Sequence, residues 1–118
     1  MSRVVGSELP PDLMARLSGR DLQPVASKVI QIVTIDEGGW PHAALLSYFE
    51  VVAADRRRVR LASYANSTTS ANMRRNGKAT LIVIDARIVY YVKAHAVELA
   101  PTMSGRSITC RSSSSVPR

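Results

Sequence analysis

The sequence predicts a mainly β protein with short helices, in which one antiparallel sheet curls into a barrel. Residues 29–99 consist of β-branched runs separated by turn residues, a pattern typical of a meander of antiparallel strands. Several of these runs are apolar at consecutive positions, as expected when one face lines a barrel and the other is covered. The chain has 118 residues, which is enough for one domain with one core.

The N-terminal segment predicts a short amphipathic helix over residues 9–17. Its prolines fall where a first helical turn tolerates them, and Leu13 and Leu17 lie one turn apart. Gly19 then provides a stop signal. This helix precedes the strands.

Five strands are predicted, over residues 28–35, 41–54, 58–63, 79–85 and 88–99. The first turn, residues 36–39, contains two glycines that can take a positive φ. Residues 55–57 form the next turn, and Ala86 and Arg87 join the last two strands as a hairpin. Five strands leave two unpaired edges, which need to be covered.

A second helix is predicted over residues 67–75, between the third and fourth strands. Asn66 or Ser67 can cap its start. Arg74 and Arg75 suit the negative end of the helix dipole, and Gly77 provides a stop signal.

We expect residues 1–101 to form the barrel domain and residues 102–118 to form an irregular tail rich in Ser and Arg. The tail shows neither strand alternation nor helical periodicity, and residues 112–115 are all serine. The barrel is therefore predicted to be incomplete at its C-terminal side.

Composition favours a cytoplasmic protein without a membrane segment. Its mean hydropathy is -0.01, its apolar runs are far shorter than the roughly 20 residues of a spanning helix, and its N-terminus lacks a signal-peptide core. Cys110 is the single cysteine, so we expect no intrachain disulfide and no metal site. The net charge of +7 favours an anionic partner, either a phosphorylated small molecule or nucleic acid.

Hydroxyl side chains gather where the second helix begins. Ser67, Thr68, Thr69 and Ser70 occupy its first turn, where unpaired amides and the positive end of the dipole favour an anion. The same residue types also serve as ordinary helix caps. The pattern therefore allows either a phosphate site or simple capping.

The order of these segments resembles a known family. Gly39, Trp40 and Pro41 open the second strand, the third strand ends in Ala62, Ser63 and Tyr64, and the hydroxyl-rich helix and Asn76-Gly77 follow. This order is similar to the pyridoxamine 5'-phosphate oxidase-like, FMN-binding split-barrel family over about residues 29–99. The resemblance implies an antiparallel split β-barrel, a homodimer holding FMN between its subunits, and a flavin-dependent oxidoreductase acting on a small-molecule substrate.

The resemblance also implies cofactor-binding residues on two segments. The second strand would line the flavin ring through backbone groups, and the end of the third strand with the helix start would hold the phosphate. These residues are Ala44, Leu45, Leu46 and Ser47 on the second strand, Ala62 and Ser63 on the third, and Ser67, Thr68, Thr69 and Asn72 on the helix. No catalytic side chain is assigned, because the cofactor carries out hydride transfer.

Three positions depart from the family pattern. Thr68, Thr69 and Ala44 stand where the oxidases carry basic residues, so a divergent flavin or deazaflavin reductase is expected rather than pyridoxamine phosphate oxidation. A second hypothesis is a non-catalytic flavin or deazaflavin binding protein, or a fold relative without a cofactor. A third is nucleic-acid association through the basic residues 56–60, the least favoured partner because turn arginines are usually solvated.

Overall fold

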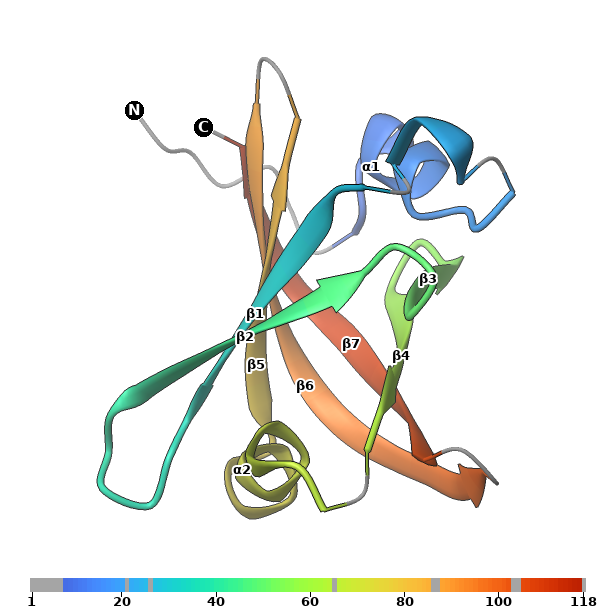
Figure 1. Cartoon of the computed structure of the whole chain (residues 1–118). Helices are drawn as coiled ribbons and strands as arrows, with labels where there is room; N and C mark the ends of the chain where they lie inside the picture. The colour runs from blue at the N-terminus through green and yellow to red at the C-terminus, as the bar shows by residue number, and fades with distance from the viewer. Residues whose placement is uncertain are drawn as a thin grey trace.

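The protein folds as one seven-stranded antiparallel sheet with two short α-helices (Figure 1). The computed structural model describes residues 8–20, 22–25, 27–64, 66–85, 88–102 and 105–117. The strands are β1 Val29–Ile35, β2 Pro41–Ser47, β3 Val51–Asp55, β4 Arg58–Ser63, β5 Lys78–Ile84, β6 Val89–Thr102 and β7 Gly105–Pro117. The helices are α1 Pro11–Arg16 and α2 Thr68–Asn76, with a 3-10 turn at Gln23–Val25. The predicted fold class is confirmed.

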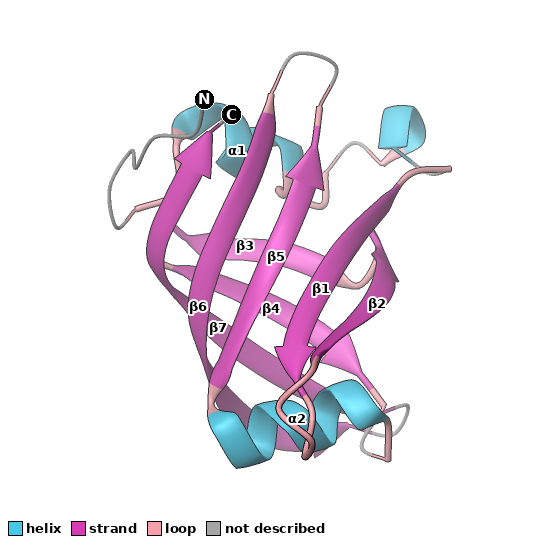
Figure 2. Ribbon diagram, turned by 90° about the vertical axis from the view of Figure 1, so that its left-hand side faces the viewer, coloured by secondary structure: helices cyan, strands magenta, loops and turns pink. Residues whose placement is uncertain are grey.

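The sheet bends into two layers that enclose the core. Strand order is β2-β1-β5-β6-β7-β4-β3, and Figure 2 shows β6, β5, β1 and β2 in front with β7, β4 and β3 crossing behind them. The two edge strands, β2 and β3, follow each other in the chain with only residues 48–50 between them. The bend therefore brings the two edges of the sheet close together.

The prediction of one strand over residues 41–54 was wrong, because the chain turns after Ser47. The Glu50 carboxylate accepts hydrogen bonds from the backbone amide and the hydroxyl of Ser47 at 3.0 and 2.8 Å. The Glu50 amide donates to the Ser47 carbonyl at 3.1 Å. Residues 47–50 include neither Gly nor Pro, so their composition gives no strong turn signal.

The expectation of an irregular tail over residues 102–118 was also wrong. Residues 105–117 form β7, which pairs with β6 on one side and with β4 on the other. Strand formation depends on context, and a segment with weak strand character is held when both of its neighbours offer backbone partners. β7 thus fills the gap that the five-strand prediction left open. Residues 103, 104 and 118, like the predicted turn residues Ala86 and Arg87, lie outside the described part.

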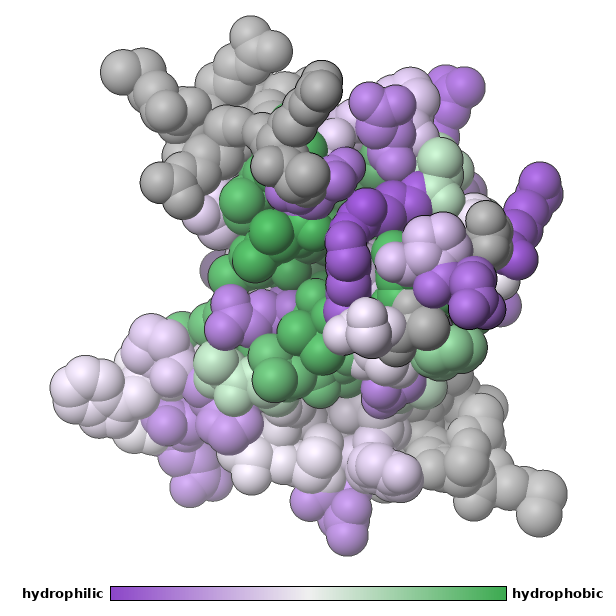
Figure 3. Space-filling view, turned by 45° about the horizontal axis from the view of Figure 1, so that its top comes forward, coloured by the Kyte–Doolittle hydropathy of each residue, from purple (hydrophilic) through white to green (hydrophobic). Residues whose placement is uncertain are grey.

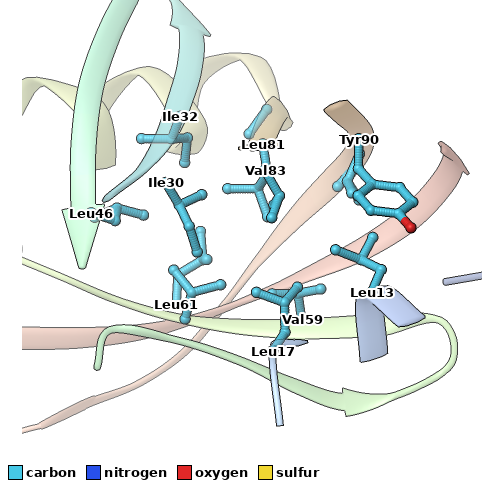
Figure 4. Close-up of a cluster of buried hydrophobic side chains, with 14 of the residues drawn as sticks. Leu13, Leu17, Ile30, Ile32, Leu46, Val59, Leu61, Leu81, Val83 and Tyr90 are labelled. Atoms are coloured by element: carbon cyan, nitrogen blue, oxygen red, sulfur yellow. The ribbon is translucent and has the colours of Figure 1, made fainter. Parts of the chain in front are cut away.

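The helices close the two ends of the bent sheet (Figure 2). Both lie close to their predicted positions: α1 is shorter by a few residues, and α2 has Ser67 as its N-cap and Gly77, with φ 75, as its C-cap. Figure 4 shows Leu13 of α1 and Leu17, the C-cap that follows it, pointing toward the strand residues of the core. The most deeply buried of these apolar side chains include Ile30, Ile32, Leu61, Leu81, Val83 and Val92.

One arginine ties α1 to the sheet. The Arg16 guanidinium donates to the hydroxyl of Tyr48 at 2.9 Å and to the Ile84 carbonyl at 3.1 Å, and it lies 5.4 Å from the centre of the Tyr48 ring. Tyr48 is 1% exposed, so its hydroxyl depends on this partner. Nearby, burial raises the pKa of Tyr90, the carboxylates of Asp12 and Asp85 add to this effect, and Arg16 opposes it.

Candidate functional site

The start of α2 is fixed by three serine hydroxyls. Ser67 Oγ accepts the backbone amide of Ser70 at 3.1 Å and donates to Ser70 Oγ at 3.0 Å. Ser70 Oγ donates to the Tyr64 carbonyl at 2.7 Å, and Ser63 Oγ lies 2.7 Å from Ser70 Oγ. Since Ser70 uses its proton on Tyr64, Ser63 is the donor in that last contact. All three hydroxyl protons are thus engaged within the cluster.

Thr68 and Thr69 carry polar groups that take no part in the serine cluster. Among the described residues, no acceptor is found for their two backbone amides. Thr68 is exposed, whereas Thr69 is 8% exposed. Two amides and a hydroxyl at the positive end of a helix form an arrangement that suits an oxyanion.

Asn72 anchors the same helix to β1. Its side chain is 2% exposed; Nδ2 donates to Thr34 Oγ1 at 3.0 Å, and Oδ1 accepts from Arg75 at 2.8 Å. Arg75 also donates to the Ile35 carbonyl at 3.0 Å and pairs with Glu37 at 3.8 Å. Asn72 therefore positions α2 from within the fold, and its contact with a cofactor stays a prediction.

The second group of predicted residues lies on β2, an edge strand. The Asp36 amide donates a hydrogen bond to the Trp40 carbonyl. In an antiparallel ladder, pairs that exchange backbone hydrogen bonds alternate with pairs that do not. The hydrogen-bonded pairs across β1 and β2 are therefore 34/42, 32/44 and 30/46. The amides of Ala43 and Leu45 then point away from β1. Leu45 is 63% exposed, whereas Leu46 is 9% exposed and belongs to the core.

Glu50 brings the two predicted groups together. Its carboxylate holds Ser47 at the end of β2, and its carbonyl accepts the amide of Ala62 on β4 at 2.9 Å. Ser47 and Ala62 therefore lie on either side of one residue. Sequence reasoning missed Glu50, and it placed Ser70 in the hydroxyl cluster without listing it among the cofactor-binding residues.

An open hollow lies elsewhere on the described part of the chain. It has a volume of about 600 Å³ and lies beside the C-terminal end of α2, over the outer face of β1, β5 and β6. Some of the lining residues lie on the outer face of the sheet, because they alternate along their strands with buried residues. These are Val33, Ile35, Lys78, Thr80, Lys93 and His95. None of the ten predicted cofactor residues lines it, so their role stays a prediction.

The outer face of β2, β1, β5 and β6 is rich in apolar side chains. Val29, Leu45, Ile84 and Val97 are each more than half exposed, at 52%, 63%, 58% and 57%. The strand register places Leu45 opposite Gln31, Gln31 opposite Ile82, and Ile82 opposite Tyr91 across the four strands. Figure 3 shows hydrophobic side chains gathered in a hollow on one face of the molecule, with hydrophilic side chains around them.

The strand order and the bend of the sheet define an antiparallel protein of the split-barrel type. A family model described as pyridoxamine 5'-phosphate oxidase matches residues 21–108. The chain therefore belongs to the pyridoxamine 5'-phosphate oxidase family. Within the described residues, no helix has the length and apolar character needed to cross a membrane.

Individual relatives agree with this assignment. The Bacillus subtilis (strain 168) protein YclD is 37% identical over 89 residues, which are 75% of this chain and 58% of YclD. The chain thus spans little more than half the length of that relative. A candidate pyridoxamine 5'-phosphate oxidase from Lactobacillus delbrueckii has a TM-score of 0.70 at 15% identity, covering 98% of both chains. An F420 reductase has a TM-score of 0.57 at 11% identity, covering 78% of this chain and 91% of its own.

Proposed function

We propose that the protein is a flavin-dependent oxidoreductase that binds FMN, or a deazaflavin, in a homodimer. The observation that carries this proposal is the start of α2, where the serine cluster holds Thr68 and Thr69 with open amides. Family membership and the structural likeness to an F420 reductase support the choice of cofactor class.

The residues at the helix start fit a phosphate through neutral donors. Thr68 and Thr69 would contact it through their amides, and the exposed Thr68 hydroxyl adds a third donor. Ser63 and Ser67 would act indirectly, because their protons are engaged within the cluster. A helix N-terminus favours an anion even without a basic side chain.

The free edge of β2 would accommodate the ring. The amides of Ala43 and Leu45 point away from β1, and the small side chains at residues 43 and 44 leave the backbone accessible to a flat ring. When bound, the flavin would supply the hydride chemistry; the chain would bind it, orient it and exclude water.

The apolar outer face supports the dimer part of the proposal. Exposed Val29, Leu45 and Ile84 lie on one side of the sheet, and a contiguous apolar surface of this kind marks an interface. Leu45→Glu should therefore shift the protein to a monomer in light scattering after gel filtration. The matched variant Arg60→Glu, exposed on β4, should leave the oligomeric state unchanged.

Two substitutions at one residue test the phosphate site. Thr68→Lys restores a positive charge, and a charge-assisted contact of about 1.5 to 3 kcal/mol corresponds to roughly a tenfold or greater gain in FMN affinity. Thr68→Asp places a negative charge that suits the helix dipole but repels phosphate, so FMN affinity should fall at least about tenfold. Flavin fluorescence quenching gives both constants.

Riboflavin, which lacks the phosphate, is the internal control. Its affinity should be the same in wild type, Thr68→Lys and Thr68→Asp. Equal FMN affinity in all three proteins would refute the phosphate site at α2. Colourless protein that takes up neither FMN nor F420 would refute the flavin proposal as a whole and favour a fold relative without a cofactor.

The non-catalytic alternative rests on the neutral residues at positions 44, 68 and 69. A carrier would bind FMN without turning it over, so bound flavin that no nicotinamide donor reduces would favour it. Nucleic-acid association would rest on the basic turn between β3 and β4, where Arg57 pairs with Glu8 at 3.7 Å and Arg58 with Asp55 at 3.8 Å. Steeply salt-dependent binding to duplex DNA would be its mark.

A further inference from the structure

We propose that His42 of the edge strand β2 binds the phosphate group of the flavin, as the charged partner of the neutral donors at the start of α2. This proposal rests on the proposed function and adds one residue to it. Thr68 and Thr69 offer only neutral groups, and Ala44 on β2 offers none. An imidazolium from the same strand would supply the missing positive charge.

His42 faces the inner side of the bent sheet at its free edge. Along β2, Leu46 is buried, Ala44 is partly buried against the core, and His42 is partly buried. Residues 41, 43 and 45, which alternate with them, are exposed. Within the described residues, the imidazole has no hydrogen-bond or ion-pair partner. The ring is therefore available to a ligand on the inner side of the strand.

The path of α2 brings its first turn toward β2. The helix ends at Asn76, directly before β5 begins at Lys78, and Asn72 in its middle contacts Thr34 of β1. Strand β1 lies between β5 and β2. Followed back toward its start, the helix therefore runs from β5 across β1 toward β2 (Figure 2). Thr68 precedes Asn72 by one turn, about 6 Å along the axis, and neighbouring strands are separated by roughly 4.8 Å.

His42 is the residue of β2 that meets this turn. It pairs with Thr34 across β1 and β2, and paired residues on one face have Cβ atoms about 4.5 to 5.5 Å apart. One step across the sheet from Thr34 leads to His42, and one turn back along the helix from Asn72 leads to Thr68. Both steps go in the same direction, so the imidazole and the start of α2 can reach one bound group.

A buried hydroxyl without a partner points to a ligand in the same place. Thr68 and Thr69 lie four and three residues before Asn72, so all three side chains share the helix face that meets β1. Thr69 is 8% exposed, and its hydroxyl makes no hydrogen bond in the part of the chain that the structure describes. Buried polar groups are normally hydrogen-bonded. A phosphate oxygen between Thr69 and His42 would satisfy both.

The charged groups around His42 are engaged elsewhere. In the β1–β2 turn, the Asp36 carboxylate accepts the Trp40 amide at 2.9 Å, and Glu37 pairs with Arg75 of α2 at 3.8 Å. The inner-face neighbours of His42 on β1 and β2 are uncharged. Histidine changes its charge near neutral pH, and a phosphate dianion within hydrogen-bond distance favours the imidazolium, which takes its second proton from solvent.

The test compares FMN with riboflavin, which lacks the phosphate. His42→Gln keeps a polar side chain without the charge, and its FMN affinity should fall at least about tenfold. His42→Arg keeps a positive charge and should lose less. Riboflavin should bind wild type and both variants equally, which shows that the ring site is intact. The matched control is Arg58→Gln, which removes one charge from the exposed β3–β4 turn and should keep the FMN affinity of wild type.

Protein labelled with nitrogen-15 at histidine gives a direct readout. His42 and His95 are the only histidines, so the signals that are lost in His42→Gln identify His42. At neutral pH, FMN should move these signals to those of an imidazolium, in which both ring nitrogens carry protons. Riboflavin should leave them unchanged. A histidine with a purely structural role would show no difference between the two ligands.

The outcomes separate this proposal from the site on which it rests. If Thr68→Asp weakens FMN binding and His42→Gln does not, the phosphate site at α2 stands and the role of His42 is refuted. If neither variant changes FMN affinity, the phosphate site itself is refuted. Equal weakening of FMN and riboflavin in His42→Gln, or an equal loss of FMN affinity in Arg58→Gln, would also overturn the proposal. Protein that binds neither flavin would overturn both.

Discussion

Removal of the Asn72 side chain should destabilise the protein far more than its small size suggests. In Asn72→Ala, Thr34 Oγ1 loses the donor that now lies at 3.0 Å, and Thr34 is only 2% exposed. Leaving a buried acceptor without a partner costs about 1 to 3 kcal/mol. Arg75 loses its 2.8 Å contact with Asn72 but keeps the Ile35 carbonyl, so this second loss is smaller.

Helix propensity opposes this loss. Alanine is a better helix former than asparagine by roughly 0.6 kcal/mol, which offsets part of the loss. The net destabilisation should be about 0.5 to 2.5 kcal/mol. Urea unfolding followed by circular dichroism should therefore show a lower midpoint with an unchanged slope. Several protein concentrations are needed, because the proposed dimerisation would raise apparent stability by mass action.

A double-mutant cycle identifies the interaction itself. Thr34→Val removes the acceptor, so Asn72→Ala should cost less in that background, with a coupling of about 1 to 2 kcal/mol. Thr68→Ala, exposed on the same helix, is the control and should change stability by less than about 0.5 kcal/mol. Strictly additive effects of the Thr34 and Asn72 substitutions would refute the buried hydrogen bond as the anchor of α2.

Two further predictions concern α1 and its surroundings. Arg16→Met should destabilise the fold by about 2 kcal/mol, because Tyr48 is 1% exposed and its hydroxyl loses the donor at 2.9 Å. Arg58→Met at the exposed β3–β4 turn should have little effect. Burial raises the pKa of Tyr90 above its usual 10.0, so the folded chain keeps a proton that the unfolded chain releases. This contribution to stability is fully present below pH 10.0 and is lost as the pH rises through the folded pKa. Tyr90→Phe should therefore reduce the loss of stability between pH 9.5 and 11, and an unchanged alkaline slope would contradict this assignment.

The sequence predicted most closely those elements whose signals are local. The cap of α2 at Ser67 and its end at Gly77 are encoded by residue types that suit those positions alone. The turn at Glu50 was missed because it depends on one side chain folding back onto Ser47. A carboxylate within an apolar run has no turn preference of its own.

Long-range pairing accounts for the other failures. β7 is a strand because β6 and β4 flank it, and neither neighbour can be inferred from the composition of residues 105–117. The open hollow likewise depends on the register that sets Lys78 opposite His95. These two residues are 17 positions apart in the chain, and no motif links them.

The replacement of basic residues at the helix start changes what the site requires of the fold. A lysine attracts phosphate over several ångströms and tolerates displacement, whereas an amide acts only within hydrogen-bond distance and with the correct direction. The phosphate site proposed at Thr68 and Thr69 must therefore hold its backbone rigidly. The serine cluster on one side and the Asn72 contact with Thr34 on the other fix that backbone. Loosening α2 through Asn72→Ala should therefore weaken FMN binding as well as lower stability, and flavin fluorescence quenching would measure that loss of affinity.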